Sequence, residues 1–431
     1  MSSALYRNDR VGAFPDSWYV ATVDHPSLRP DLRGSHTADV CVVGAGYTGL
    51  SAARVLAQAG LRVIVLDAHR AGFGASGRNG GQVASGYNAS QRVLAQKLGA
   101  ETAKDLWTLT EEAKADIATF GDTIQHTPGV AHGCYSDGER ADISENVAFL
   151  NTAYGYDKVE VHDQADFAKI VNTPLYKGGV IDKGAAHIHP LRYALALAKA
   201  AEDAGAQIYE TSPVHHVAKG AKLAIRTSKG RVTVDHVVLA TNGYIGGLER
   251  AVAAKVMPMN SFIVATEPLV DQAQNVLSQN IAVEDSKHFV NYYRLSDDKR
   301  LLFGGRASAR TAFPKDIASI LTPRMTQLFP QLAGARIDYA WGGALGVTTS
   351  ALPAIQRIGP NIVSAGGFTG HGVALSGLCG KILGEAILGQ ASRFDTLASL
   401  PTPNFPAGHF GGRSLLSAFV LLANLRERLG V

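Results

Sequence analysis

The hydrophobic positions between residues 38 and 67 change from a continuous run to a helical period and back again. Ala38–Val43 (ADVCVV) contains one charged residue, Asp39, and ends in four consecutive apolar residues, typical of a strand buried on both faces. Leu50–Ala59 (LSAARVLAQA) has apolar residues at helical spacing, and Gly60 is placed to end that helix. Arg62–Asp67 (RVIVLD) is a second apolar run. The pattern predicts a strand–helix–strand unit within about 30 residues.

The rest of the chain predicts further helices and strands. Apolar residues at helical spacing predict helices at Gln91–Leu98, Ala100–Phe120, Pro190–Ala204, Pro323–Phe329 and Val373–Leu388. Apolar or alternating runs predict strands at Ala206–Glu210, Leu223–Thr227, Arg231–Val234, Val237–Ala240, Ser261–Thr266, Phe289–Leu295, Arg300–Gly304 and Ile362–Ala365, with the second and third forming a hairpin.

The order of these elements predicts a nucleotide-binding domain made from separated segments, with a second domain inserted between them. The segments are residues 36–90, 180–255 and 335–395 for the cofactor domain, and residues 91–179 and 256–334 for the substrate domain. Residues 1–35 are expected to form an N-terminal arm, and residues 396–431 a tail with an amphipathic helix at Ser414–Leu429. The apolar stripe of that helix can meet a membrane or a partner, but packing on its own domain is the commoner outcome.

Composition narrows the class of protein. The chain has 431 residues, with 41 Lys and Arg against 37 Asp and Glu, and the net charge of +4 argues against a nucleic-acid-binding protein. Hydrophobic residues make up 46%, which is enough for a large core and excludes wholesale disorder.

Cysteine usage and the lack of long apolar stretches indicate the compartment. Cys41, Cys134 and Cys379 are odd in number and widely spaced, so neither a disulfide framework nor a metal site is expected. Met1–Gly12 has no apolar run, unlike a signal peptide. No uncharged stretch approaches the roughly 18 residues of a membrane span. We therefore expect a cytoplasmic protein without a membrane span.

Three glycines between the first strand and helix carry the strongest chemical signal. Gly44, Gly46 and Gly49 form the dinucleotide fingerprint, in which glycine allows a tight turn, close approach of the backbone to a pyrophosphate, and close helix–strand packing. The pyrophosphate is expected at Tyr47 and Thr48, because N–H groups and the dipole at a helix N-terminus favour anions.

The second strand and the loop after it identify the cofactor. Asp67 ends the strand eighteen residues after Gly49, where its carboxylate can accept both ribose hydroxyls and disfavours the 2′-phosphate of NADP. Gly72–Gln82 (GFGASGRNGGQ) is a long glycine-rich loop that a nicotinamide enzyme does not need. In an FAD enzyme, the chain needs such a loop to run past the pyrophosphate and reach the flavin ring. The predicted contacts are Ser76, Arg78, Asn79, Gly80, Gly81 and Gln82. The alternative is a flexible surface loop.

A third glycine cluster follows the predicted strand Ile362–Ala365. Gly366–Gly372 (GGFTGHG) leads into a helix and makes a second anion-compatible helix N-terminus. Placed under a flavin, it would stabilise negative charge on the reduced ring. We assign Gly367, Thr369, Gly370, His371 and Gly372 to the cofactor site. For His371, packing or capping is an equally good interpretation.

Eight stretches together resemble the D-amino-acid-oxidase-like family of FAD amine oxidases: 14–19 (FPDSWY), 38–67, 72–82, 187–191 (HIHPL), 292–302 (YYRLSDDKRLL), 329–339 (FPQLAGARIDY), 367–372 (GFTGHG) and 425–431 (LRERLGV). The resemblance implies an α/β, two-domain, glutathione-reductase-like fold with an inserted antiparallel-sheet substrate domain. It also implies oxidation of a C–N bond, with gamma-glutamylputrescine as substrate and O2 as electron acceptor. We further assign Ala68, Val214, Thr241 and Asn242 to FAD binding.

Two departures from the family pattern change details of this expectation. Relatives that bind flavin covalently use a Cys ahead of the last strand, and residues 341–360 contain none, so the resemblance implies non-covalent FAD. Phe368 stands where a Tyr is typical, which alters packing near the ring.

Candidate substrate-binding residues lie in the inserted domain. Arg294 and Arg306 are the natural bidentate partners for a substrate carboxylate, and we assign them to the catalytic site together with Tyr293 and His371, with Tyr292 as a further candidate. Taken alone, each arginine is also a candidate surface residue. Glu284 and Asp285 are able to attract a cationic amine, but we interpret them as a solvated loop pair.

His187 and His189 precede the predicted helix at Pro190, and we interpret both as structural residues. No acid–base dyad is needed for the expected reaction, because a desolvated site that lowers the pKa of the amine suffices.

Two alternatives for the activity stay open. The first is oxidation of an amino acid such as sarcosine, a D-amino acid or pipecolate, with electrons passed to O2 or a quinone. The second is a flavin-binding subunit without turnover.

Overall fold

The computed structural model describes residues 4–406, 416–418 and 420. At its base is a six-stranded sheet in the order β18-β19-β12-β2-β3-β8, parallel except for β18. Its strands are β2 (Val40–Val43), β3 (Val63–Leu66), β8 (Gln207–Tyr209), β12 (His236–Leu239), β18 (Ala354–Arg357) and β19 (Ile362–Gly366). The predicted strand–helix–strand unit is confirmed, with α2 (Tyr47–Gln58) as its helix.

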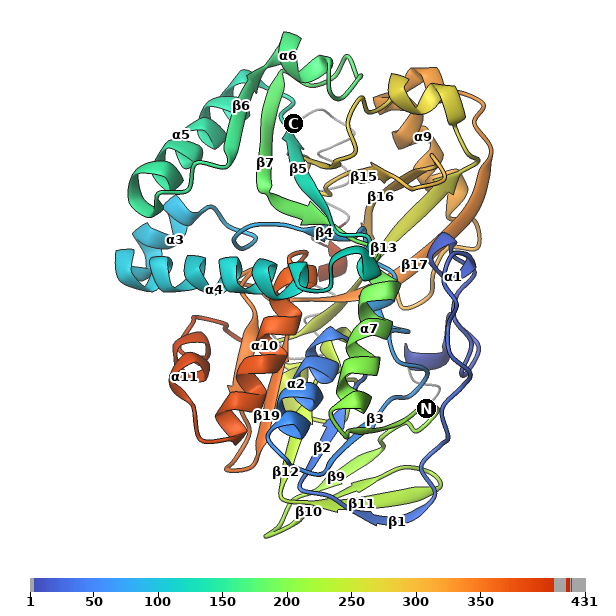
Figure 1. Cartoon of the computed structure of the whole chain (residues 1–431), viewed down its shortest axis with the longest axis vertical. Coiled ribbons are helices and arrows are strands. Elements are labelled where there is room, and N and C mark those ends of the chain that lie inside the picture. The colour runs from blue at the N-terminus through green and yellow to red at the C-terminus, as the bar shows by residue number, and fades with distance from the viewer. Residues whose placement is uncertain (1–3, 407–415, 419, 421–431) are drawn as a thin grey trace.

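The two faces of this sheet are covered by different layers (Figure 1). Val40 and Val42 pack in one core with α2, α7 (Pro190–Asp203) and α10 (Gly372–Ile387). Cys41 and Val43 pack in another core with a four-stranded sheet. That sheet runs β1-β11-β10-β9 through β1 (Gly34–Thr37), β9 (His216–Ala218), β10 (Leu223–Arg226) and β11 (Gly230–Val234). Cover on both faces is the reason the strand has no polar position.

The second domain is built on a nine-stranded mixed sheet in the order β17-β13-β16-β15-β14-β5-β7-β4, with β6 also paired to β7. The strands are β4 (Gln82–Val83), β5 (Thr127–Gly133), β6 (Val159–Asp163), β7 (Gly178–His187), β13 (Met257–Thr266), β14 (Ala282–Asp285), β15 (Tyr292–Leu295), β16 (Leu301–Ser308) and β17 (Ile337–Val347). Its pairs are antiparallel except β14 with β5. The predicted antiparallel sheet therefore contains one parallel pair, and that pair lies at the site described below.

The glycine-rich loop runs directly into the second sheet. Gln82 and Val83 form β4, which pairs with the end of β7. One face of the sheet packs in an apolar core with α9 (Ala318–Leu328) and other elements. The opposite face is turned toward the cofactor loops, since Arg294 and Trp341 on it bond to backbone carbonyls of that loop.

The remaining helices are α1 (Trp18–Ala21), α3 (Gln91–Leu98), α4 (Ala100–Ala118), α5 (Asp137–Tyr154), α6 (Gln164–Ala168), α8 (Arg250–Ala253) and α11 (Ser392–Ala398). Short 3-10 helices are η1 (Ala4–Tyr6), η2 (Ala75–Gly77), η3 (Gly121–Ile124), η4 (Asn242–Tyr244), η5 (Val270–Asn275) and η6 (Pro330–Leu332). The helices predicted near residues 91, 100, 190 and 373 are confirmed. Helix α9 begins at Ala318, before the predicted start, and contains Pro323 in its interior.

Helix α4 runs across the middle of the view between the two sheets (Figure 1). Its buried residues Leu106 and Ala113 belong to the core that also contains Val40 of the six-stranded sheet. The predicted domain boundaries stay a prediction.

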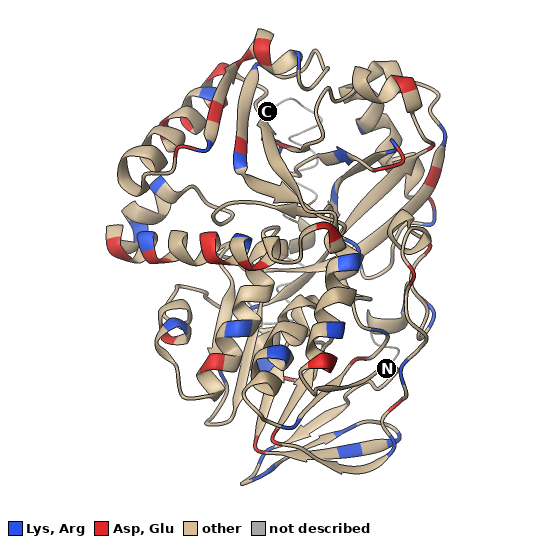
Figure 2. Cartoon of the chain, viewed as in Figure 1, with Lys and Arg blue, Asp and Glu red and all other residues tan. Residues whose placement is uncertain are grey.

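Charged residues of both signs are interspersed along the elements, most visibly on α4 (Figure 2). Within the described ranges, none of the helices is long and apolar enough to cross a membrane. Most of the predicted helix at Ser414–Leu429 lies outside the described residues.

Candidate active site

The fingerprint turn leaves no room for a side chain at Gly44 or Gly49. Gly44 has φ +107°, and a Cβ there would lie 2.6 Å from the carbonyl oxygen of Ala240 at the end of β12. A Cβ on Gly49 would lie 1.8 Å from the carbonyl oxygen of Gly44. Gly46 is the N-cap of α2 and has no side chain to cap the helix, although Ser76 Oγ accepts from Tyr47 N at 3.0 Å. The N-terminus of α2 is therefore open to an anion, as the fingerprint predicts.

Asp67 holds the end of β3 against this turn. Its two carboxylate oxygens accept hydrogen bonds from Ala45 N and His69 N, both at 2.8 Å. Burial raises the pKa of Asp67 to about 6, opposed by these two donors and reinforced by the charge of Glu210. Each oxygen keeps a lone pair for a ribose hydroxyl.

The adenosine end of the candidate site is bordered by two further segments. Tyr6 of the N-terminal arm donates to the carbonyl oxygen of Ala68 over 3.4 Å, and Ser212 N donates to Asp67 O over 2.7 Å. The loop that contains Ser212 also carries Val214, so the structure brings Ala68, Val214 and Asp67 to one end of the sheet.

The glycine-rich loop is an ordered, largely buried structure, so its interpretation as a flexible surface loop is wrong. Asn79 organises it, donating to Ala75 O (3.0 Å) and accepting from Gly81 N (2.8 Å). Ser76 Oγ accepts from Tyr47 N at 3.0 Å, which joins the loop to the start of α2.

Arg78 spans the loop and the second sheet. It donates to Phe73 O (2.7 Å) and to Gly342 O (3.0 Å), and its Nη1 lies 3.2 Å from Asp9 Oδ1. Its buried Nη2 has no partner within the described part of the chain. That nitrogen is available to a ligand.

The loop before α10 forms the other side of the site. Gly367 N donates to Asn242 Oδ1 at 2.9 Å, and Gly370 has φ +97°. Thr369, although not glycine, has φ +47°, a strained conformation of the kind that concentrates at ligand-binding loops.

His371 is the N-cap residue of α10, but its side chain makes no cap hydrogen bond. Its Nδ1 is buried without a partner among the described residues. The capping interpretation of His371 is therefore wrong. The N-terminus of α10, which begins at Gly372, lacks a side-chain cap and can face an anionic group.

Glu284 and His132 face each other on the sheet surface turned toward these loops. They are register partners in the parallel pair of β14 with β5, and Glu284 also lies opposite Tyr292 of β15. Glu284 Oε1 lies 3.4 Å from His132 Nδ1, and the two side chains are 30% and 29% exposed. The interpretation of Glu284 as part of a solvated loop is wrong, because it lies in a strand.

The electrostatics of this pair favour an ionised carboxylate. Burial raises the pKa of Glu284, but the hydrogen bond and charge of His132, with the charge of His371, outweigh burial and lower it. Burial lowers the pKa of His132, but Glu284 and then the charges of Asp285 and Glu139 outweigh burial and raise it.

Tyr292 connects this face to the cofactor loop. A Cβ on Gly80 would lie 2.7 Å from its ring, and its hydroxyl lies 3.0 Å from Ser261 Oγ. Gln82 Nε2 donates to Val283 O at 2.9 Å. These contacts bring Gly80, Gln82 and Glu284 together.

Two residues predicted as catalytic, Tyr293 and Arg294, are buried. Tyr293 is 2% exposed and packs in the apolar core on the opposite face of the sheet, because neighbouring residues of a strand point to opposite faces. Arg294 is 4% exposed and donates to Gly80 O (3.1 Å), Ile188 O (3.2 Å) and Leu295 O (3.3 Å). Its guanidinium is committed to backbone carbonyls rather than to a substrate carboxylate.

Arg306 lies in an irregularity of β16 where the register with β13 shifts, at φ +60°.

Of the two histidines before α7, His189 has the structural role that was expected, and for His187 that role stays a prediction. His189 is the N-cap of α7 and accepts from Arg192 N at 3.3 Å through Nδ1, while its Nε2 lies 3.2 Å from Thr22 Oγ1. His187 is buried, and burial followed by the charge of Arg294 lowers its pKa to about 3.

The residues of the turn, loop and α10 fit an FAD molecule. Two buried polar atoms, Thr241 Oγ1 and Arg78 Nη2, have no partner in the part of the chain that the structure describes. The turn at Gly44–Gly49 packs directly against the carbonyl oxygens of Ala240 and Gly44, where no Cβ fits, as the close packing of a dinucleotide-binding turn requires. FAD held by these residues would supply a hydride acceptor.

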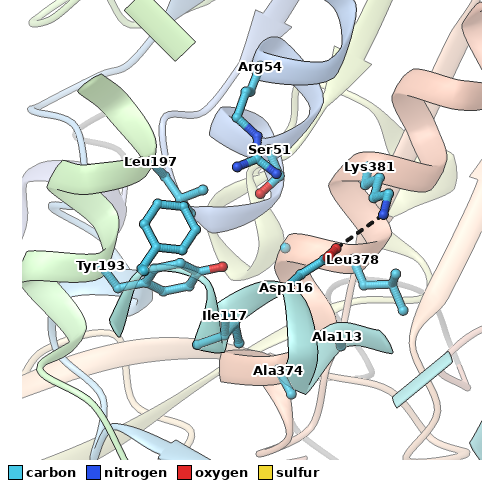
Figure 3. Close-up of a pocket in the computed structure, with 12 residues that line it drawn as sticks. Ser51, Arg54, Ala113, Asp116, Ile117, Tyr193, Leu197, Ala374, Leu378 and Lys381 are labelled. Carbon is cyan, nitrogen blue, oxygen red and sulfur yellow. Dashed lines mark hydrogen bonds and ion pairs between the residues drawn. The ribbon is translucent and has the colours of Figure 1, made fainter. Parts of the chain in front are cut away.

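A separate pocket lies between α2, α4, α7 and α10 (Figure 3). Arg54 and Tyr193 line it, together with the ion pair of Asp116 and Lys381, which are 3.2 Å apart. No residue assigned to FAD lines this pocket, and it belongs to the helix layer rather than to the candidate site.

Comparison with known proteins gives matches over nearly the full length. The family described as "DAO: FAD dependent oxidoreductase" matches residues 39–386. The "Probable oxidoreductase OrdL" of Rhizobium meliloti (strain 1021) is 37% identical over 412 residues, covering 94% of this chain and 95% of the relative. The "Gamma-glutamylputrescine oxidoreductase" of Escherichia coli (strain K12) is 36% identical over 425 residues, covering 96% and 99%. The crystal structure of glycine oxidase from Geobacillus kaustophilus has a TM-score of 0.68 at 20% identity, covering 82% and 95%.

Proposed function

The chain belongs to the DAO family of FAD-dependent oxidoreductases, and we propose that it oxidises the terminal primary amine of gamma-glutamylputrescine. One amine, O2 and water give the gamma-glutamyl aminobutyraldehyde, ammonia and hydrogen peroxide. The observation that carries this substrate is the 36% identity over 425 residues to the Escherichia coli gamma-glutamylputrescine oxidoreductase, of which 99% is covered.

The geometry supports the reaction class through the residues that would surround the reacting carbon. The Gly80–Gln82 loop and the N-terminus of α10 hold one side, and the sheet face with Tyr292 and Glu284 forms the other. The open helix end favours negative charge on the acceptor. The absence of Cys from residues 341–360 supports non-covalent attachment of FAD.

The site favours an amine over an α-amino acid. Arg294, the arginine expected to bind an α-carboxylate, is committed to three backbone carbonyls, and the facing carboxylate of Glu284 would repel such a group. A glycine-oxidase-like activity is therefore our second candidate, supported by fold similarity alone.

Peroxide formation by the purified yellow protein tests the proposal. We expect peroxide with gamma-glutamylputrescine and a much slower reaction with putrescine, which lacks the glutamyl group that helps to position the substrate. Glycine, sarcosine, D-alanine and pipecolate serve as the amino-acid panel. Activity confined to that panel would overturn the amine assignment, and no peroxide from any compound would favour a flavin-binding subunit or a quinone as acceptor.

Cofactor attachment and location complete the proposal. Acid precipitation should release all yellow colour into the supernatant, and colour in the pellet would contradict non-covalent binding. The cytoplasm stays our predicted location, supported by the unpaired state of Cys41, Cys134 and Cys379.

A further inference from the structure

We propose that Glu284 is the anchor for the ammonium group of the substrate, with His132 as the side chain that holds it in place. The site would then select primary alkylammonium ions at this face of the sheet. The inference deepens the proposed function and rests on it for the reaction that follows binding.

The direction of the Glu284 side chain follows from the sheet. Its neighbour Asp285 points to the other face, where it is fully buried and accepts from Tyr135 OH (2.8 Å) and Asn291 Nδ2 (2.7 Å). Adjacent strand residues point to opposite faces, so Glu284 points to the face that carries His132 and Tyr292. That is the face against which Gly80 packs.

The carboxylate has capacity for a further cation. Among the described residues, the hydrogen bond that Glu284 makes is to His132 Nδ1, at 3.4 Å, which is long for such a bond. A carboxylate offers about four lone-pair sites. A half-buried, ionised carboxylate with most of its acceptor sites open is a receptor for an ammonium group, which brings three donors.

Two neighbouring histidines explain why the carboxylate of Glu284 stays ionised before substrate binds. His132 and, from the N-cap of α10, His371 both act on Glu284 and lower its pKa against the effect of burial. His371 comes from the loop assigned to the flavin, so the anchor lies between the sheet and the cofactor loop.

The test uses the FAD-loaded protein and a probe that cannot react. The tert-butylammonium ion is a primary ammonium without hydrogen on the carbon that bears nitrogen, and pivalate is the carboxylate of the same shape. Flavin absorbance is titrated with each ion in the wild type, Glu284→Gln and Glu160→Gln. The last is a matched control, because Glu160 lies on β6 with 47% of its side chain exposed and pairs with Lys183.

We expect saturable binding of tert-butylammonium but not pivalate to the wild type and to Glu160→Gln. Loss of one charge-assisted bond should weaken ammonium binding by Glu284→Gln about 10- to 100-fold. Glu284→Asp, which keeps the charge, should recover part of that loss and shows that the effect is not misfolding. Unchanged ammonium binding by Glu284→Gln with full FAD content, or preference of the wild type for pivalate, overturns the anchor.

Kinetics separate this inference from the proposed function. With gamma-glutamylputrescine, Glu284→Gln should raise KM about 10- to 100-fold and change kcat less. If no amine is oxidised but tert-butylammonium binding depends on Glu284, the anchor stands and the proposed function falls. If gamma-glutamylputrescine is oxidised with the same KM in wild type and Glu284→Gln, the function stands and the anchor falls.

Discussion

Arg294 Nε donates to the carbonyl oxygen of Gly80 over 3.1 Å, so that a side chain of the substrate domain holds the loop assigned to the flavin. A second bond, to Ile188 O at 3.2 Å, ties the same guanidinium to the segment before α7. The glycine at the next position is needed for this contact: a Cβ on Gly81 would lie 2.2 Å from Ile188 O and 3.5 Å from Arg294 Nε. Arg294 thus joins the nine-stranded sheet to the glycine-rich loop and to the segment before α7.

Replacement of Arg294 by Ala should lower stability and FAD retention more than substrate binding. Three backbone carbonyls lose a donor, which costs about 2–4 kcal/mol of unfolding free energy. Urea unfolding and the FAD-to-protein ratio measure these effects, and KM for the amine should change less than tenfold. Arg226→Ala, at an exposed position of β10, is the control and should stay within about 0.5 kcal/mol. A large rise in KM with normal FAD content would restore the carboxylate-binding role.

The N-terminal arm is expected to retain FAD through Asp9. The guanidinium of Arg78 is 1% exposed, and Asp9 is the acid 3.2 Å from it. Asp9→Asn leaves that buried charge without its counter-ion, and we expect FAD to dissociate about tenfold faster, measured by flavin fluorescence after dilution. Asp16→Asn, an exposed position on the same arm, should release FAD at the wild-type rate. Equal rates in both variants would show that the arm has no part in retention.

Local patterns along the chain predicted the cofactor half well. The βαβ unit depends on residues close in sequence, and its change from a strand pattern to a helical period and back can be read directly from the sequence. Helix α5 was not predicted, although its start carries a readable signal: Ser136 and Glu139 form a capping box.

The structure of the substrate half depends on which strands pair, and the spacing of residues along the sequence does not show that pairing. Strand β14 has four residues, and its parallel partner β5 ends about 150 residues earlier in the chain. Without the pairing, Glu284 and Asp285 are two adjacent acids. With it, one faces the site beside His132 and the other is buried on the opposite face.

Asp67 should make FAD binding sensitive to mild acid. Its pKa, raised to about 6 by burial, means that the carboxylate is ionised and able to accept ribose hydroxyls above that pH and is protonated below it. The affinity of apoprotein for FAD should therefore fall about tenfold from pH 7 to pH 5. Fluorescence titration across this range measures it.

The stability of the apoprotein should respond to Asp67 in the opposite direction. A carboxyl whose folded-state pKa is raised binds protons more readily folded than unfolded, so its effect on stability becomes more favourable as pH falls from about 6 toward the ordinary value of about 4. Asp67→Asn should bind FAD more weakly at pH 7 and remove both dependences. Retention of the full pH slope of FAD affinity in Asp67→Asn would place the titrating group elsewhere.

Substitutions at two of the fingerprint glycines should have different effects, one on stability and the other on FAD binding. A Cβ on Gly49 meets the carbonyl oxygen of Gly44 at 1.8 Å, so Gly49→Ala should destabilise the apoprotein by about 3 kcal/mol. A Cβ on Gly46 meets the end of the Ser76 side chain at 2.9 Å, which can move. Gly46→Val should therefore have an unfolding free energy within about 1 kcal/mol of wild type. It should nevertheless purify without colour, because the valine side chain blocks the pyrophosphate. Yellow Gly46→Val with full FAD content would contradict the turn's assignment.

The neighbouring tyrosines Tyr292 and Tyr293 should separate activity from stability. Tyr292 lies opposite Glu284 with its hydroxyl 3.0 Å from Ser261 Oγ, whereas the hydroxyl of Tyr293 lies 3.1 Å from that of Tyr176 in the core. Removal of the core hydroxyl in Tyr293→Phe should cost about 1 kcal/mol of unfolding free energy and leave kcat/KM for the amine within about twofold.

Tyr292→Phe should behave in the opposite way, because its ring still packs on Gly80 but no longer has a hydroxyl bonded to Ser261 on the site face. We expect a fall of about tenfold in kcat/KM with less than about 0.5 kcal/mol change in unfolding free energy. The two variants differ from wild type by the same single oxygen, so each is the control for the other. A loss of activity in Tyr293→Phe but not in Tyr292→Phe would mean that the substrate approaches the opposite face of the sheet, and Glu284 would then have no access to it.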